Sequence, residues 1–204
     1  MKIIIDERET AIYEKCQQLI ASQCPPFSTI KIEKQVLPIG DVLFKTDDDQ
    51  QIISIIERKT IADLLASIKD GRYAEQSYRL VNQKECSIHN IVYLIEGNIN
   101  AVSYNEKRLV LSSMTSLGFF KGFSTMRTTS VAETAEWILL TADKIERNLQ
   151  KHEQLACCLT EIVGGDQPTP QTYSTFQIIA IANKRTKRPL IKKIFFFIIM
   201  EKRL

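Results

Sequence analysis

The pattern of hydrophobic and polar residues changes repeatedly between the period of a strand and that of a helix over residues 1–152. Short apolar runs indicate buried strands at residues 2–5 and 90–97. Apolar residues three and four positions apart predict helices within four segments, residues 9–22, 61–68, 106–117 and 131–149. Alternating strands and helices of this kind are typical of an α/β domain.

Three further strands are expected in the first third of the chain, at residues 29–37, 38–44 and 52–56. With a polar turn at residues 45–51, they predict a β-meander. This meander would place Asp41 and Glu57 on adjacent strands, within a few ångström of each other. Lys59 follows Glu57 by two residues, so in an extended chain its side chain points to the same side.

Two neighbouring carboxylates repel each other unless a cation lies between them. Oxygen ligands on a rigid sheet suit Mg²⁺ or Mn²⁺. A divalent ion beside a lysine suits hydrolysis of a phosphodiester, because the ion lowers the pKa of a bound water and offsets charge on the phosphorus oxygens. The sequence therefore predicts a metal-dependent hydrolytic site at Asp41, Glu57 and Lys59.

Composition narrows the class of protein. The chain has 204 residues, of which 44% are hydrophobic and 25% charged, as in ordinary globular domains. Its longest apolar run, residues 194–200, is too short to span a membrane. The five cysteines are odd in number and form no C-x-x-C motif, so we expect reduced thiols in an intracellular protein without membrane association.

One motif consists of Gly40-Asp41, then fifteen residues, then Glu57-Arg58-Lys59 and finally Asp63. This motif resembles the G-D…E-R-K-x-x-x-D signature of the XPF-type nuclease family. The segments "IIIDERE" (residues 3–9) and "SIKDGRYAEQSYRL" (residues 67–80) also resemble parts of that family's nuclease domain. The resemblance implies a restriction-endonuclease-like fold, with a central mixed β-sheet flanked by helices.

The resemblance also implies roles for individual residues. Asp41 and Glu57 would be the principal metal ligands, with Lys59 as the catalytic lysine. Two acids on the first strand, Asp6 and Glu9, would complete or support the metal site. The remaining residues are expected to bind DNA or hold the structure: Arg8; Arg58, through buried carboxylates or DNA; Asp63, which could pair with Arg58 or face the site; and Arg72, a phosphate or carboxylate clamp.

The carboxy-terminal part departs from the family pattern. The last glycine is Gly165, so the helix-hairpin-helix pair that follows the nuclease domain in this family is not expected, because such hairpins need glycine near the DNA backbone. We expect a nuclease domain at residues 1–152, a linker-like segment at 153–183 and a basic, apolar tail at 184–204. Homo- or heterodimerisation would then depend on the nuclease domain, through the helix at 131–149, whose apolar seam docks either on the sheet or on a second subunit.

The resulting functional prediction is a Mg²⁺- or Mn²⁺-dependent endonuclease that cuts branched DNA (flaps, forks or junctions) in repair or recombination. The alternatives are a catalytically inactive DNA-binding partner subunit and an interaction module without DNA affinity of its own. In a eukaryote or a nuclear virus the protein would act in the nucleus, and otherwise in the cytoplasm.

Overall fold

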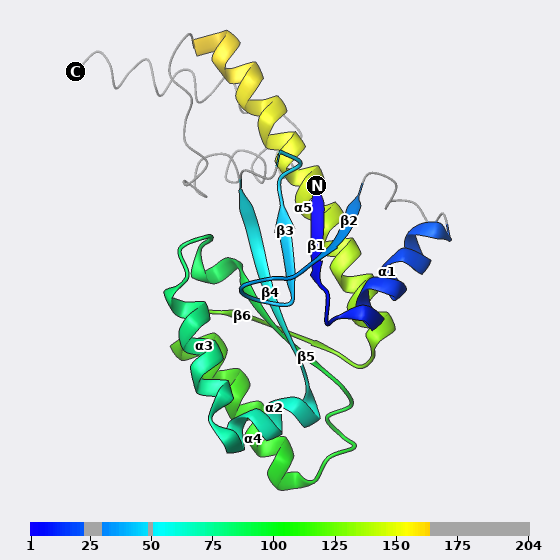
Figure 1. Ribbon diagram of the computed structural model, residues 1–204. Helices are drawn as coiled ribbons and strands as arrows, with labels where there is room; N and C mark the ends of the chain where they lie inside the picture. Colours follow the sequence, from blue (N-terminus) through cyan, green and yellow to red (C-terminus); the bar gives the residue numbers. More distant parts are fainter. Residues whose placement is uncertain (23–29, 49–50, 164–204) are drawn as a thin grey trace, which may run out of the picture. The chain divides into compact units, whose positions relative to one another are not determined.

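The computed structural model describes residues 1–22, 30–48 and 51–163 (Figure 1). Residues 1–150 form one compact unit, and residues 151–204 form a second. The predicted basic tail and most of the predicted linker-like segment lie outside the described residues. Among the described residues, no helix combines the length and apolar character that a bilayer span requires.

Six strands form a single mixed sheet in the order β2-β1-β3-β4-β5-β6. Their bounds are Lys2–Asp6 (β1), Lys31–Gln35 (β2), Val42–Lys45 (β3), Ile52–Thr60 (β4), Ile91–Glu96 (β5) and Ser124–Thr128 (β6). The strand β3 is antiparallel to both of its neighbours, β1 and β4, whereas the remaining pairs are parallel. The predicted mixed sheet is therefore confirmed.

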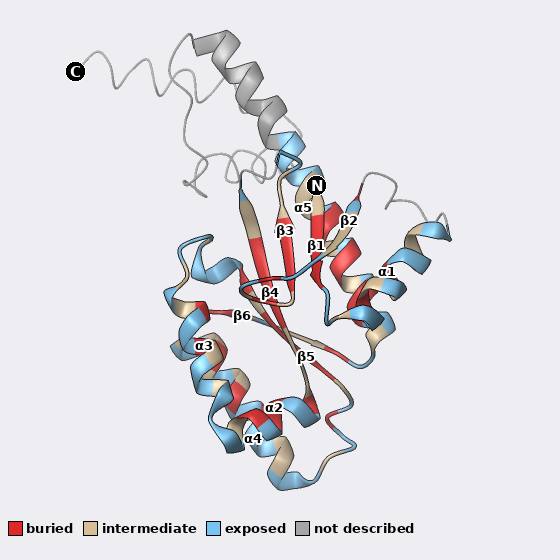
Figure 2. Cartoon of the chain, viewed as in Figure 1, coloured by how far each residue is buried: buried red, intermediate tan, exposed pale blue. Residues whose placement is uncertain are grey.

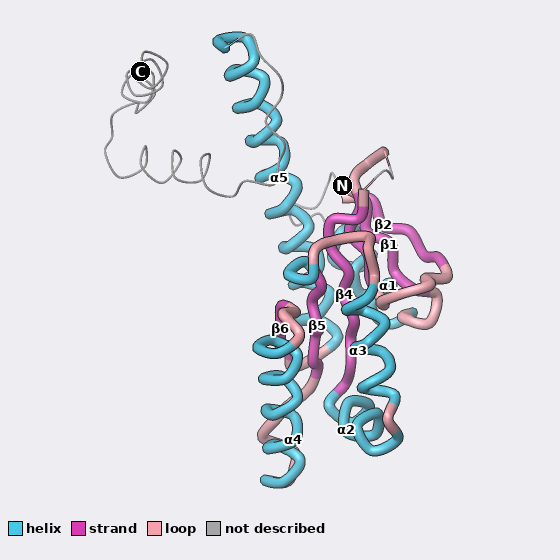
Figure 3. Tube along the Cα trace, turned by 90° about the vertical axis from the view of Figure 1, so that its left-hand side faces the viewer, coloured by secondary structure: helices cyan, strands magenta, loops and turns pink. Residues whose placement is uncertain are grey.

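Five α-helices of the described residues connect and cover these strands. They are α1 (Thr10–Ala21), α2 (Ile61–Asp70), α3 (Arg72–Asn82), α4 (Tyr104–Thr115) and α5 (Val131–Val163). Short turns of other helix types occupy Ile88–Asn90 (η2) and Ser116–Phe120 (η3). Figure 3 shows α2 beginning where β4 ends, with α3 following it directly.

The predicted three-strand meander is wrong in its first member. β3 and β4 form the expected hairpin, but β2 pairs in parallel with β1 at the edge of the sheet. The physical reason is the helix α1, which provides the crossover connection that a parallel pair requires. An edge strand exposes part of its surface, which explains the alternating polarity that the sequence shows there (Figure 2).

Alternate residues of the central strands contribute to two separate cores, one on each face of the sheet. On one face, Ile3 and Ile5 of β1 pack with α1 and α5. On the other face, Ile4 and Tyr93 pack with α2, α3 and α4. The continuous apolar run of β5 is buried on both faces, as predicted, because the strand lies between β4 and β6 and contributes to both cores.

The apolar seam of α5 docks on the sheet. Ala135, Ile138, Leu139 and Ala142 are all buried in the core shared with α1. The helix also continues to Val163, beyond the predicted end at residue 149. The sequence contains no glycine or proline from residue 131 to residue 163, so nothing in it interrupts a helix before Gly164.

Candidate functional site

The turn before β3 fixes the position of Asp41. Gly40 has a φ of +71°, and a Cβ atom there would lie 2.6 Å from Cγ2 of Ile55. Only glycine fits this conformation and this close approach. The main chain of Asp41 then bonds to both neighbouring strands: its amide donates to the Ile56 carbonyl at 2.8 Å, and its carbonyl accepts from the Asp6 amide at 2.9 Å.

Asp41 and Glu57 lie next to each other at the end of the β3–β4 hairpin. In the antiparallel β3–β4 register, Val42 pairs with Ile56. Asp41 directly precedes Val42 and Glu57 directly follows Ile56, so these two acids lie opposite each other on neighbouring strands. Burial raises the pKa of Asp41 above its ordinary value. Burial, and secondarily the charge of Asp41, raises the pKa of Glu57 to about 7. The two carboxylates thus destabilise each other's charged form, as the sequence predicted for an acid pair without a cation.

Lys59 lies on the same side of β4 as Glu57, as predicted. Its Nζ atom is 3.3 Å from Oε1 of Glu57, and its side chain is only 13% exposed. The ammonium group is therefore held beside the acid pair.

The side chain of Arg58 is directed toward other carboxylates. It donates to both oxygens of Glu96 at 3.0 and 2.6 Å, and to Glu9 at 2.8 Å. Glu96 is buried at the end of β5 and also accepts from the hydroxyl of Thr134 on α5 at 2.6 Å. Of the two partners expected for Arg58, buried carboxylates or DNA, these ion pairs show the carboxylates, and a role in holding the fold stays a prediction. The same ion pairs also tie β4 to β5 and to the start of α1.

Glu96 and Thr134 were not identified from the sequence. A sequence signal existed for Glu96, since it is an acid at the end of a strand that is otherwise apolar. Its pairing with Thr60 in the parallel β4–β5 ladder is what brings it to Arg58.

Asp6 is almost fully buried, and both of its oxygens already have donors. Arg8 donates to it through Nε at 2.6 Å and through Nη2 at 3.2 Å, and the Leu37 amide donates at 2.9 Å. These hydrogen bonds, with that of the Arg8 side chain foremost, lower the pKa of Asp6 to about 2. Asp6 does not line the cleft described below, whereas Arg8 does. A role for Asp6 as a metal ligand stays a prediction, and its observed contacts hold Arg8 at the cleft.

The acid pair opens into a cleft of about 320 Å³. Its polar lining includes Glu9 and Asp63, both predicted from the sequence, and five basic residues: Arg8, Arg58, Lys59, Arg72 and Arg79. Thr60 caps the start of α2, because its hydroxyl oxygen accepts from the Asp63 amide at 3.1 Å. The same hydroxyl donates to Oδ2 of Asp63 at 2.7 Å, so the Asp63 carboxylate is bound to Thr60 rather than to Arg58. The sequence left two positions open for Asp63, paired with Arg58 or facing the site, and in the structure Asp63 lines the cleft.

The turn between α2 and α3 carries Gly71 and Arg72. Gly71 has a φ of +84°, and this left-handed conformation ends one helix and begins the next. Arg72 binds Asp70 at 2.7 Å and lines the cleft. Two further cleft residues on α3, Gln76 and Arg79, lie in the segment that resembles the family, but the sequence analysis gave them no role. Their spacing from Arg72 places all three on one helix face.

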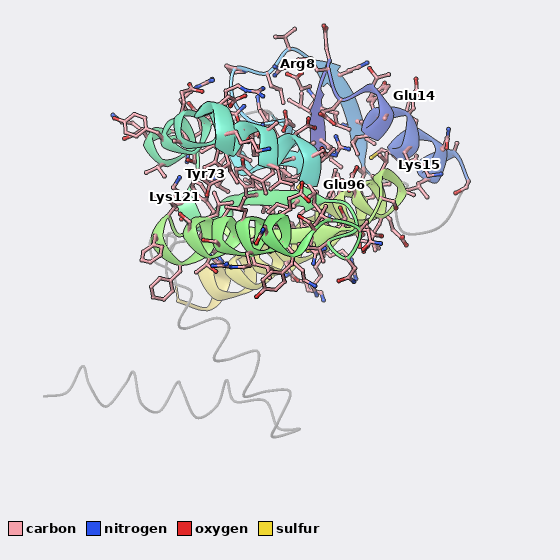
Figure 4. All side chains as sticks on the ribbon, turned by 90° about the horizontal axis from the view of Figure 1, so that it is seen from below. Arg8, Glu14, Lys15, Tyr73, Glu96 and Lys121 are labelled. Atoms are coloured by element: carbon pink, nitrogen blue, oxygen red, sulfur yellow. The ribbon has the colours of Figure 1, made fainter. Side chains whose placement is uncertain are left out.

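The wall behind Glu57 is aromatic. Tyr93 is Glu57's partner in the β4–β5 register, and its ring lies 6.5 Å from that of Tyr73. The Nζ atom of Lys121 lies 4.9 Å from the centre of the Tyr73 ring. Figure 4 shows Lys121 and Tyr73 side by side. Tyr93 is buried beside Glu57, and burial is what raises the pKa of Glu57.

The donor set fits a divalent cation that keeps part of its water shell. Asp41 and Glu57 offer carboxylate oxygens, and their mutual repulsion is relieved by a positive charge between them. Across the described side chains, no set of three or more His, Cys, Asp or Glu residues forms a metal cage. Mg²⁺ typically binds through one or two carboxylates plus water and substrate phosphate, so the acid pair suits this ion and argues against a closed structural site.

The fold and the site together define a restriction-endonuclease-like domain. Comparison with solved structures agrees: XPF from Aeropyrum pernix superposes with a TM-score of 0.56 at 24% sequence identity, covering 81% of this chain and 76% of that chain. XPF from the same organism in a complex with DNA superposes with a TM-score of 0.54 at 23% identity, covering 72% and 65% of the two chains.

A family model, the ERCC4 domain, matches residues 5–141, which is more than half of the chain. The chain therefore belongs to the ERCC4 domain family of XPF-type nucleases. This result confirms the resemblance that the G-D and E-R-K motifs indicated.

Curated relatives share the same region. The crossover junction endonuclease MUS81 of Oryza sativa is 33% identical over 110 residues, which is 52% of this chain and 16% of that protein. The structure-specific endonuclease subunit MUS81 of Mus musculus is 38% identical over 100 residues, or 48% and 17% of the two proteins. The match thus spans less than a fifth of the length of either relative.

Proposed function

We propose that this protein is a metal-dependent, structure-specific DNA endonuclease that hydrolyses phosphodiester bonds in branched DNA during repair or recombination. One observation carries the proposal: Asp41 and Glu57 are paired at the end of a hairpin, with the Lys59 ammonium 3.3 Å from Glu57, in a cleft lined by arginines. Membership of the ERCC4 domain family supports a nuclease, and the MUS81 relatives, named as a crossover junction endonuclease and a structure-specific endonuclease subunit, support branched substrates.

Asp41 and Glu57 would hold Mg²⁺ or Mn²⁺. When bound, the ion supplies positive charge at the scissile phosphate and lowers the pKa of a coordinated water. In-line attack by water would leave a 5′-phosphate and a 3′-hydroxyl. The protein's own groups must position the phosphate and stabilise the charge that develops on its oxygens.

Lys59 is placed for this task. Its ammonium lies beside Glu57, so it can orient the attacking water or donate to a phosphate oxygen. Arg58 would act indirectly, through Asp41. Its main-chain amide donates to Oδ2 of Asp41 at 2.7 Å, and its side chain is hydrogen-bonded to Glu96 and Glu9. Arg58 is therefore a positioning residue that leaves one Asp41 oxygen available for the ion.

A partner subunit belongs to the same proposal. The mouse relative is named as a subunit of a structure-specific endonuclease, and homo- or heterodimerisation through the nuclease domain would supply a second DNA-binding surface. In a eukaryotic cell the substrate would be nuclear DNA. Size-exclusion chromatography with light scattering tests for a homodimer directly.

The experiment mixes the full chain with labelled flap, fork and linear duplex DNA in Mg²⁺. Asp41→Asn, which removes charge at nearly constant shape, serves as the control. Cleavage of the branched substrates that is lost in Asp41→Asn supports the proposal. Binding of DNA without cleavage by either protein supports an inactive partner subunit instead, and absence of both binding and cleavage supports an interaction module.

A further inference from the structure

One face of α3 lines the cleft with residues that the chemistry of the acid pair does not use. Arg72, Gln76 and Arg79 are separated by four and three positions, the spacing of a single helix face, and all three line the cleft. We name this set the α3 strip. Resting on the proposed function, we propose that the α3 strip binds the phosphodiester backbone of the DNA strand next to the scissile phosphate.

The two guanidinium groups retain donors for such a contact. Arg72 is 63% exposed and uses Nε for Asp70. Arg79 is 54% exposed, donates Nη2 to the Pro38 carbonyl at 2.8 Å and has Glu75 at 3.7 Å. A guanidinium carries five N–H donors in a planar fork that matches phosphate oxygens, so each side chain keeps most of its donors for a ligand.

Gln76 is the third polar side chain of the α3 strip. It lies between the two arginines on the strip, and its Oε1 is buried without a hydrogen-bond partner in the described structure. A buried acceptor without a donor is costly, so a water molecule in the cleft is expected to donate to this oxygen. The NH₂ group of the same amide is a donor, so Gln76 can join the neighbouring arginines in binding phosphate oxygens.

The spacing of the strip favours a strand over a single anion. Seven residues of helix separate Arg72 from Arg79, a rise of roughly 10 Å along the axis. Two guanidinium groups so far apart suit different phosphates of one strand better than one free phosphate. Arg79 is also tied to Pro38, three residues before Asp41, so the strip and the acid pair border the same cleft. A strand held along α3 would therefore pass the reacting centre.

Binding in a salt series tests this inference. Fluorescence anisotropy of a labelled fork is measured with the full chain in EDTA, comparing the wild type with Arg72→Ala, Arg79→Ala and the double variant. Each loss of a phosphate contact should reduce the salt slope of binding by about one. Affinity at low salt should fall about tenfold per arginine, since hydrogen bonds to charged groups are strong. Arg79→Lys should retain the slope.

The matched control is Arg108→Ala. Arg108 is an exposed arginine on α4 that does not line the cleft, and its replacement changes the net charge by the same amount. Its salt slope should equal that of the wild type. Under cleavage conditions the strip variants should raise KM with little change in kcat, as expected where binding is equal in ground and transition states.

Three outcomes would overturn the inference. One is a double variant that keeps the wild-type salt slope and KM while the wild type still cuts the fork, which leaves the proposed function standing. The second combines two results: Arg79→Ala lowers the melting temperature, and Arg72→Ala keeps the wild-type salt slope of DNA binding. Together they would show that the strip serves only to stabilise the fold. The third is that inorganic phosphate inhibits binding of the fork far more strongly than chloride does at the same ionic strength. This result would indicate a site for a free anion rather than for a DNA strand. If the wild type neither binds nor cuts DNA, the proposed function itself fails.

Discussion

The main-chain amide of Arg58 donates a hydrogen bond of 2.7 Å to Oδ2 of Asp41, linking the middle residue of the E-R-K motif to the acid of the G-D motif. The same residue sends its side chain to Glu9 and Glu96. One residue thus orients a candidate metal ligand with its backbone and fastens three elements with its guanidinium. This double use explains why a strand that is otherwise buried carries an arginine near its end, between Glu57 and Lys59.

Replacing Arg58 with methionine should destabilise the fold. Glu9 and Glu96 would lose their shared cation while remaining largely buried, and breaking a buried ion pair in this way costs about 3–5 kcal/mol. Urea denaturation measures the free energy of unfolding. Arg108→Met, at an exposed position, should change it by less than about 0.5 kcal/mol. Equal midpoints for the two variants would contradict a structural role for the ion pairs.

Gly40→Ala should be more harmful than Gly71→Ala. Both glycines have positive φ, which costs an L-residue roughly 1–2 kcal/mol. A Cβ at Gly71 would meet nothing within 4 Å, whereas one at Gly40 would clash with Ile55. We expect a larger drop in melting temperature for Gly40→Ala, together with loss of DNA cleavage, because Asp41 must shift. Equal melting temperatures would show that the turn adapts to a side chain.

The free energy of unfolding should depend on the protonation of Glu57 when no metal is present. The folded pKa of about 7 lies above the ordinary value of 4.5, so the folded state favours the neutral acid. This contribution is complete below pH 4.5 and is lost as the pH rises to about 7, on the order of 3 kcal/mol. Unfolding in EDTA across this range should show the decline in the wild type.

Glu57→Gln provides the comparison for that experiment, since its amide cannot ionise. The difference in unfolding free energy between the two proteins should change steadily from pH 4.5 to 7. A difference that stays flat over this range means that Glu57 is ionised normally in the fold.

Metal binding can be measured without any DNA. A ligand that binds only the folded state stabilises it, by about 2.7 kcal/mol at a hundredfold excess over Kd. Mn²⁺ or Mg²⁺ should therefore raise the melting temperature of the wild type at pH 7 and leave that of Asp41→Asn unchanged. Equal shifts in both proteins would place the ion away from Asp41.

Lys59→Met should separate binding from chemistry. Loss of a single charged donor near the reacting phosphate lowers kcat by about 10²–10³ in comparable sites. Binding of the labelled fork in EDTA should stay close to wild type, because the arginines of the cleft remain. Unchanged cleavage rates in single-turnover experiments would remove Lys59 from the chemistry.

The sequence predicted those parts of the fold that depend on local pattern. The β3–β4 hairpin, the doubly buried β5 and the placement of Lys59 beside Glu57 all follow from residue periodicity. The position of β2 did not, because its alternating residues fit an edge strand next to either β1 or β3. That choice depends on the crossover through α1, which periodicity does not specify.

The same limit applies to the site. Asp41, Glu57 and Lys59 are close in sequence and were placed correctly relative to each other. The bond from Arg58 to Glu96 joins strands whose register is set by packing, and the engagement of Asp6 by Arg8 depends on a turn. Both contacts follow from the three-dimensional arrangement of the backbone, which the pattern of residues in a single sequence does not specify.

The direction of the β3–β4 hairpin has a practical consequence. Asp41 and Glu57 occupy one end of this pair of strands, while Lys45 and Ile52 are paired at the opposite end. A dye or affinity tag inserted between Lys45 and Ile52 would therefore lie a full strand length from the cleft, where it could label the protein without blocking the proposed DNA-binding site.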